Sequence, residues 1–268
     1  MLTGRARAAT NAAAAVSDAD ILQFALNLEY LEAEYYLYAT TGQGLPPGDI
    51  TGSGTLGTTT IKANPKVPFQ DPLYQQYAQE IATDEKDHVE YLRAALSSLG
   101  VTPVARPPLD LLNSFNTLAQ AAGIGQSFDP FENEVNFLLG AFIFEDVGVS
   151  AYRGGAGLLT NSDLIFAAAG VLGTEAYHAG SIRTTLIALQ DPNVYDIAQK
   201  ISDLRDALDG PTPKDGGLLK RGKANAILTD RNGLVYSRNT RQVLNIVYGA
   251  PNASSGLFYP NGMNGAIS

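Results

Sequence analysis

Two segments of the chain, Glu85-Lys-Asp-His-Val-Glu-Tyr-Leu-Arg-Ala-Ala-Leu96 and Glu175-Ala-Tyr-His-Ala-Gly-Ser-Ile-Arg-Thr-Thr-Leu186, share a Glu, a His, an Arg and a Leu in the same register. The histidines in these segments are the only two of the chain. Identities that stay in register over such a length indicate an internal repeat, and the repeated unit carries a Glu-x-x-His motif.

Four long helices are predicted from the spacing of the apolar residues around these motifs, at about 18–40, 72–99, 130–153 and 162–190. The pair Asp129-Pro130 is the expected N-cap and first residue of the third helix. Aligning the first helix with the third places Glu32 on Glu145. The chain therefore consists of two related helical hairpins, each with one Glu helix and one Glu-x-x-His helix.

The remaining segments are less regular. Residues 1–17 are expected to be a flexible tail or the remnant of a leader peptide, and residues 41–71 are rich in Gly, Thr and Pro, which predicts a long surface insertion. We predict an all-α fold in which residues 18–190 form a four-helix bundle. Residues 191–268 are expected to add one helix and a largely irregular extension that wraps the bundle.

Both Glu-x-x-His motifs are predicted to face the core. Positions i and i+3 of a helix share a face, so each motif presents a carboxylate and an imidazole side by side. Apolar residues surround both motifs on that face, and the other two helices each carry one Glu among apolar neighbours. The side chains expected to meet inside the bundle are Glu32, Glu85, His88, Glu145, Glu175 and His178.

Four inward carboxylates need positive charge. Burying an isolated carboxylate costs several kcal/mol, and close carboxylates repel one another or take up protons. These helix faces carry no clustered Lys or Arg, whereas two divalent ions would balance four Glu with two neutral His. Oxygen-rich ligation with one imidazole per ion favours two Fe or two Mn ions over structural zinc. We therefore predict a di-metal centre, and raised pKa values for its carboxylates when metal is absent.

Other interpretations of these residues remain open. A single Glu-x-x-His motif is usually a solvated or hydrogen-bonded pair. Glu29, one turn before Glu32, is either an extra ligand, a base that contacts the ligands, or a partly exposed ion-pair partner. Glu34 is expected to be solvated. Tyr36 is a candidate catalytic side chain that could donate an electron or a hydrogen bond near the metals, with simple core packing as the alternative.

Composition restricts the partners. The chain has 18 Lys and Arg against 27 Asp and Glu, a net charge of −9, and no basic block, which argues against nucleic acid and anionic membranes. The longest apolar run, residues 135–144, is too short to span a bilayer, so no membrane insertion is expected. Because there is no Cys, disulfides, thiolate metal sites and a cysteine nucleophile are excluded.

A resemblance to a known family rests on three segments of the chain, Asp20–Tyr36, Asn136–Val149 and Glu175–Arg183. They resemble the ferritin-like family that includes plant and bacterial desiccation-related proteins, and the resemblance covers about residues 18–265. It implies a ferritin-like four-helix bundle in which a Glu from each of two helices and a Glu-x-x-His from each of the others bind two metal ions. It also implies frequent export in bacteria, to the periplasm or the cell exterior.

Three functions are compatible with these observations. The first is a di-iron or di-manganese oxidoreductase acting on dioxygen or hydrogen peroxide, with catalase-, peroxidase- or ferroxidase-like chemistry in stress or desiccation protection. The absence of Cys and Trp suits exposure to peroxide. The second is a non-enzymatic desiccation-protection protein with a structural or vestigial metal site. The third is iron sequestration, which requires a cage or a mineral core. A homo-oligomer is compatible with each.

Overall fold

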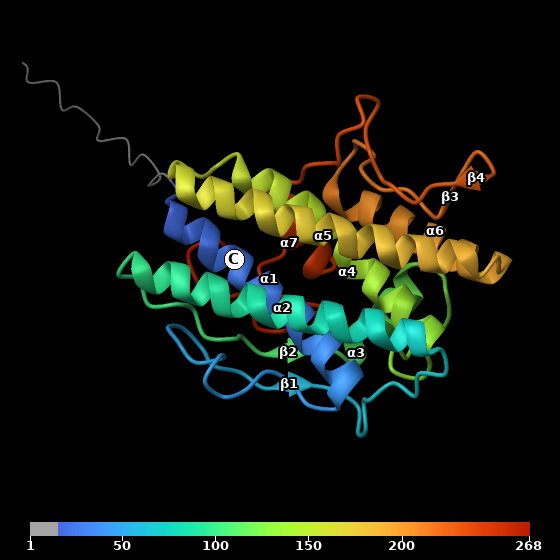
Figure 1. Cartoon of the computed structure of the whole chain (residues 1–268), viewed down its shortest axis with the longest axis horizontal. Helices are drawn as coiled ribbons and strands as arrows, with labels where there is room; N and C mark the ends of the chain where they lie inside the picture. The colour runs from blue at the N-terminus through green and yellow to red at the C-terminus, as the bar shows by residue number, and fades with distance from the viewer. Residues whose placement is uncertain (1–15) are drawn as a thin grey trace, which may run out of the picture.

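The computed structural model describes residues 16–268, so most of the predicted N-terminal tail lies outside the described residues. Four long helices run side by side (Figure 1), and the predicted all-α bundle is confirmed. Their bounds are α1 (Asp18–Thr41), α2 (Pro72–Ser98), α4 (Glu134–Ala156) and α5 (Ser162–Ala188). The main packing partners are α1 with α2 and α4 with α5, as expected for two hairpins.

The helix starts follow from local side-chain chemistry. Ser17 and Asp20 form a capping box at the start of α1. The prediction that Asp129-Pro130 opens the third helix is wrong, because the N-cap of α4 is Asn133. The Asp129 carboxylate instead accepts a 2.9 Å hydrogen bond from the Phe131 amide and pairs with Lys62, so it stabilises a turn before the helix.

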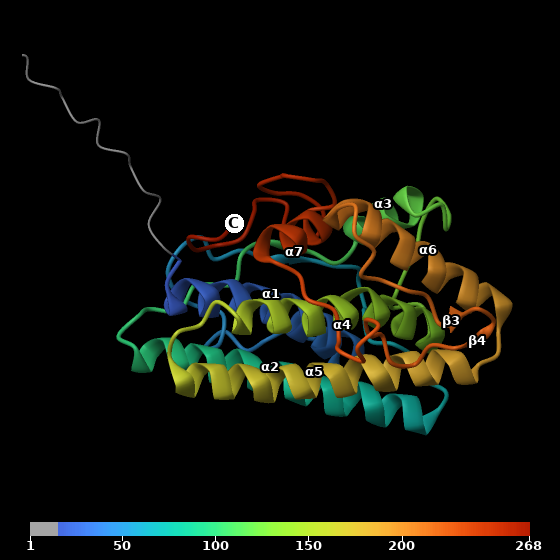
Figure 2. The same ribbon diagram turned by 90° about the horizontal axis from the view of Figure 1, so that it is seen from above.

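The bundle is covered on one side. Three shorter helices, α3 (Asn113–Ala121), α6 (Pro192–Asp209) and α7 (Thr240–Val247), lie over α1 and α4 on the side away from α2 and α5 (Figure 2). As a result α1 and α4 are buried nearly all round along their central turns, whereas α2 and α5 each keep one face exposed. The inner helices therefore lack a clear polar face.

Two small sheets and the loops complete the chain. Strand β1 (Thr59–Thr60) pairs in parallel with β2 (Leu109–Asp110), and β3 (Leu219–Lys220) pairs antiparallel with β4 (Lys223–Ala224). The first pair connects the insertion after α1 to the segment before α3.

The insertion after α1 is also anchored by a buried ion pair. Arg106 donates to the Glu34 carboxylate and to the Gly57 carbonyl. The expectation that Glu34 is solvated is thus wrong: its side chain is buried, because the insertion folds over this side of α1.

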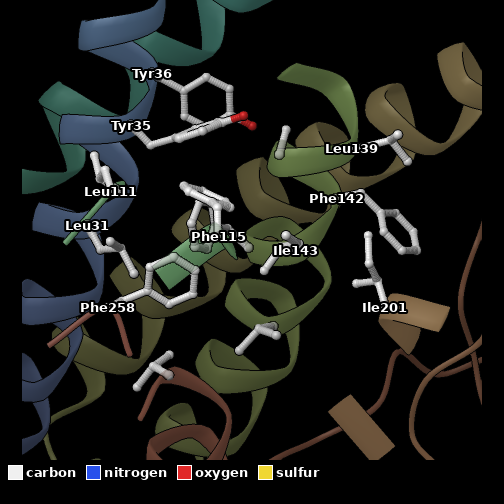
Figure 3. Packing of buried hydrophobic residues seen from close by; sticks show 14 of the residues in the cluster. Leu31, Tyr35, Tyr36, Leu111, Phe115, Leu139, Phe142, Ile143, Ile201 and Phe258 are labelled. Atoms are coloured by element: carbon white, nitrogen blue, oxygen red, sulfur yellow. The ribbon is translucent and has the colours of Figure 1, made fainter. Parts of the chain in front are cut away.

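Aromatic side chains fill the core between α1, α4 and the covering segments (Figure 3). The Tyr35 ring stacks on Phe137 with centroids 5.5 Å apart, and the Tyr35 hydroxyl donates a 2.7 Å hydrogen bond to the Phe137 carbonyl. Within the described part of the chain, α4 is the one helix long and apolar enough to cross a membrane, and 89% of its most apolar window is buried inside the protein. Its composition is accounted for by its place in this core.

A second buried network holds the C-terminal segment on the bundle. Arg183 and Arg205 lie 2.7 and 3.1 Å from the Asp146 carboxylate of α4. Arg205 also pairs with Asp215 at 2.7 Å, and Arg238 pairs with Asp215 and with Asp209. These arginines neutralise the buried aspartates, so this acidic group has its counter-charges within the protein.

Candidate metal centre

The six side chains predicted to face inward come together between α1, α2, α4 and α5. None of them is more than 8% exposed, and Glu29 of α1 joins them at 2% exposure. The chain therefore places five carboxylates and two imidazoles in one enclosed volume.

The first half of the cluster surrounds His88. Its Nδ1 atom lies 3.2 Å from Oε2 of Glu29, 3.6 Å from Oε2 of Glu85 and 3.8 Å from Oε1 of Glu175. Ligand atoms of these four residues all lie within 4.8 Å of one another, which is compact enough to hold one metal ion. Glu29 is thus a member of the cluster, and its alternative as a partly exposed ion-pair partner is excluded.

The second half surrounds His178. Its Nδ1 atom lies 3.0 Å from Oε1 of Glu85 and 3.6 Å from Oε2 of Glu145. On the other side of the ring, Nε2 lies 3.1 Å from Oδ2 of Asp84. With an ion bound, a carboxylate at Nε2 would keep the proton on that nitrogen and leave the lone pair of Nδ1 for the ion, as second partners of metal-binding histidines do.

The two halves share carboxylates. Glu85 contributes one oxygen to each histidine, and Glu175 belongs both to the group around His88 and to a third group with Glu32 and Glu145. Carboxylates that lie between the two histidines could contribute oxygen atoms to two neighbouring ions.

Two tyrosines tie the inner helices together reciprocally. Tyr36 of α1 donates to Glu145 of α4, and Tyr152 of α4 donates to Glu29 of α1. Each Tyr follows the Glu of its own helix by seven residues, so the two contacts are related by the internal repeat. This symmetry pairs Glu29 with Glu145, and the sequence alignment that placed Glu32 on Glu145 is out of register by three residues.

In the corrected register the partner of Glu32 is Gly148. A Cβ atom at this position would overlap Oε2 of Glu175 and approach Oε1 of Glu32 to 3.4 Å. The missing side chain therefore makes room for two carboxylates, and Glu32 makes the cluster asymmetric.

The arrangement fits a bound cation. Among the described residues, buried oxygen atoms of Glu32, Glu85, Glu145 and Glu175, together with Nδ1 of His178, have no hydrogen-bond partner. The 3.0 Å approach of His178 to Glu85 does not have hydrogen-bond geometry. Buried polar atoms are nearly always paired, and unpaired oxygens around imidazoles are the donors that Fe and Mn accept.

The pKa values show how the cluster is balanced without a cation. Burial raises the pKa of Glu29 to about 7, and burial together with neighbouring carboxylates raises the pKa of Glu32 and of Glu175 well above the usual value. Burial also raises the pKa of Glu145. These shifts agree with the expectation of proton sharing.

Glu85 departs from that expectation. Burial disfavours its charge, but the attraction of the two neighbouring histidines outweighs burial and lowers its pKa to about 2. In turn, the pKa of His88 rises to about 12, because the attraction of Glu29 and Glu85 exceeds the cost of burial. The histidines thus replace part of the missing positive charge.

Two participants were not expected from the sequence. Asp84 directly precedes Glu85, and a signal for it existed, because it lies one turn before His88 and therefore on nearly the same face of α2. Tyr152 would have been found by the repeated Glu-x6-Tyr spacing. Both contact the candidate ligands rather than replace them.

Comparison with known proteins agrees with the fold. The ferritin-like domain family matches residues 17–188. A ferritin-like catalase, Nec2, from Nesocodon mauritianus is 30% identical over 94% of this chain and 85% of its own length. The desiccation-related protein PCC13-62 from Craterostigma plantagineum is 32% identical over 85% of this chain and 76% of its own length. The chain belongs to the ferritin-like family.

Proposed function

We propose that this protein holds two Fe or two Mn ions in the buried cluster and uses them in redox chemistry on hydrogen peroxide. The observation that carries the proposal is the convergence of unpaired carboxylate oxygens around two histidines inside a closed bundle. Among the described residues, the salt-bridge partners of these glutamates are His88 and His178 alone, and neither Lys nor Arg pairs with them.

The residues divide into two ligand groups. Glu29 and His88 would hold one ion, Glu145 and His178 the other, with Glu85 and Glu175 available to both and Glu32 next to the second. When bound, such a pair would supply two-electron redox chemistry, by which one peroxide is oxidised to dioxygen and another is reduced to water. Atoms and electrons then balance as two peroxides to one dioxygen and two waters.

The side chains around the cluster would support that chemistry by orienting the ligands, excluding water and holding protons. Tyr36 and Tyr152 donate hydrogen bonds that fix the orientation of Glu145 and Glu29, so both act as positioning residues in this proposal. The apolar neighbours exclude bulk water, which strengthens every electrostatic interaction inside the cluster. Carboxylates with raised pKa values can hold protons beside the bound ions.

The name of one relative favours peroxide over the other oxidants, since the protein from Nesocodon mauritianus is named a catalase. The name of the second relative favours the alternative, a desiccation-protection protein whose metal is structural. Dioxygen as substrate and iron sequestration are further outcomes that the same experiment separates.

The test is oxygen evolution from hydrogen peroxide by protein reconstituted with Mn or with Fe. We expect dioxygen at half the molar amount of peroxide consumed, and a loss of at least a hundredfold in rate for Glu85→Gln, which removes a charge shared by both groups. Asp163→Asn, at the exposed start of α5, is the control and should leave the rate unchanged.

Two results would contradict the proposal. Fully loaded protein that does not consume peroxide would favour the structural role of the metal. Consumption of Fe²⁺ and dioxygen with a growing mineral core, seen by size-exclusion chromatography, would favour sequestration.

A further inference from the structure

A polar groove opens on the outer side of the bundle between α2 and α5. It encloses about 320 Å³, and its walls are Tyr77, Glu80, Ile81, Asp84, Thr174, Tyr177, His178 and Ser181. At about 30 Å³ for each water, it has room for roughly ten water molecules, enough for a cation with its hydration shell. His178 is the one candidate ligand among these residues, so the groove reaches the ring of a candidate ligand from the solvent side.

Apart from His178 at its inner end, the charged residues that line the groove are acidic. Glu80 and Asp84 stand one turn apart on α2, and no Lys or Arg lines the groove. The remaining polar groups are hydroxyls, from two tyrosines, Thr174 and Ser181. A concave surface lined by one sign of charge attracts oppositely charged solutes and raises their local concentration.

The inner end of the groove meets the cluster at a hydrogen bond. Asp84 is exposed enough to meet solvent, with its side chain 40% accessible, yet its Oδ2 lies 3.1 Å from Nε2 of the buried His178. One carboxylate thus contacts both the groove and an imidazole whose other nitrogen is unpaired in the cluster.

The groove is lined by His178 and not by His88, so it lies beside one half of the cluster. The internal repeat relates Asp84 to Thr174, so the second hairpin has a hydroxyl where the first has a carboxylate. Within the described residues His88 has hydrogen bonding only at Nδ1, to Glu29, whereas Nε2 of His178 also has a carboxylate partner, Asp84. The side of α1 and α4 away from α2 and α5 is covered by α3, α6 and α7 (Figure 2).

We propose that this groove is the entrance through which divalent cations reach the cluster, with Glu80 and Asp84 as the residues that attract them. The inference rests on the proposed function, because it requires the cluster to bind metal. An arriving ion meets Glu80 at the mouth, then Asp84, then the ring of His178. Asp84 has a second effect through His178, whereas Glu80 contributes charge alone.

The experiment measures the rate at which metal-free, full-length protein takes up Co²⁺, followed by its visible absorbance in a stopped-flow instrument. Glu80→Gln should slow uptake several-fold at low ionic strength, and Glu80→Gln with Asp84→Asn about tenfold, because the attraction is electrostatic. The difference should shrink as salt rises and screens the charges. Asp163→Asn, which removes the same charge outside the groove, is the matched control.

A second variant tests the route without changing charge. Ser181→Trp fills the groove, and we expect slower uptake at every salt concentration, with the same final amount of bound Co²⁺. The entrance is overturned if Glu80→Gln and Ser181→Trp take up Co²⁺ as fast as the unchanged protein, or if Asp163→Asn slows it equally. Unchanged protein that binds no Co²⁺ at equilibrium would instead overturn the metal centre itself, so the two failures are distinguishable.

Discussion

At position 148 the chain has no side chain where its repeat partner has Glu32, and the space is occupied by the carboxylate of Glu175. A single methyl group would have to displace a buried carboxyl oxygen. The lack of a side chain at Gly148 therefore leaves the space that the Glu175 carboxylate occupies. In the interior of a helix, Gly otherwise lowers the stability by about 1 kcal/mol relative to Ala.

We predict that Gly148→Ala lowers the free energy of unfolding by about 1–3 kcal/mol, the usual cost of overpacking, despite the better helix propensity of Ala. It should also weaken metal binding, because Glu175 has to move. Thermal unfolding and metal content would measure both effects. Gly170→Ala in α5 is the control, since a Cβ there has no neighbour within 4 Å, and it should be neutral or stabilising.

At the scale of helices, the sequence predicts which side chains face inward only where a helix has both a polar and an apolar face. Helices α2 and α5 each keep an exposed face, and their Glu-x-x-His motifs were placed correctly on the inward side. Helix α1 is buried on every side, so its pattern does not distinguish Glu29, Glu32 and Glu34, which are all buried. For the same reason the alignment of α1 with α4 slipped by three residues.

Contacts between segments distant in the sequence explain the rest. Arg106, which pairs with the buried Glu34, is 72 residues away from it in the sequence. Tyr152, which donates to Glu29, is 123 residues away from it. The N-cap of α4 was misplaced because Asp129 is engaged by Lys62 of the insertion. Local patterns contain no information about such partners.

At the scale of the whole molecule, metal and protons compete for the same cluster. The raised pKa of Glu29, about 7, means that the metal-free folded protein keeps a proton that the unfolded chain loses near pH ~4.3. Its contribution to stability is lost as pH rises through that interval. His88, with its pKa raised to about 12, stabilises the metal-free protein fully below about pH 6.5 and progressively less above it.

Both shifts make the metal-free bundle less stable at pH 8 than at pH 5.5, while metal binds the deprotonated ligands more tightly at pH 8. Bound ions stabilise the fold by about 4 kcal/mol at a thousandfold excess over the Kd. We therefore expect chelation to lower the melting temperature more at pH 8 than at pH 5.5. An equal or opposite difference, measured by differential scanning calorimetry, would contradict the competition between metal and protons for this cluster.

The most direct test of the central claim is the ratio of metal to protein, measured by elemental analysis of full-length protein purified without added metal and after reconstitution with Mn or Fe. We predict about two ions per chain for the unchanged protein, and a lower ratio with the fold retained for Glu145→Ala. A chain that binds no Fe or Mn under either condition, or a Glu145→Ala variant with the full two ions, would contradict the account.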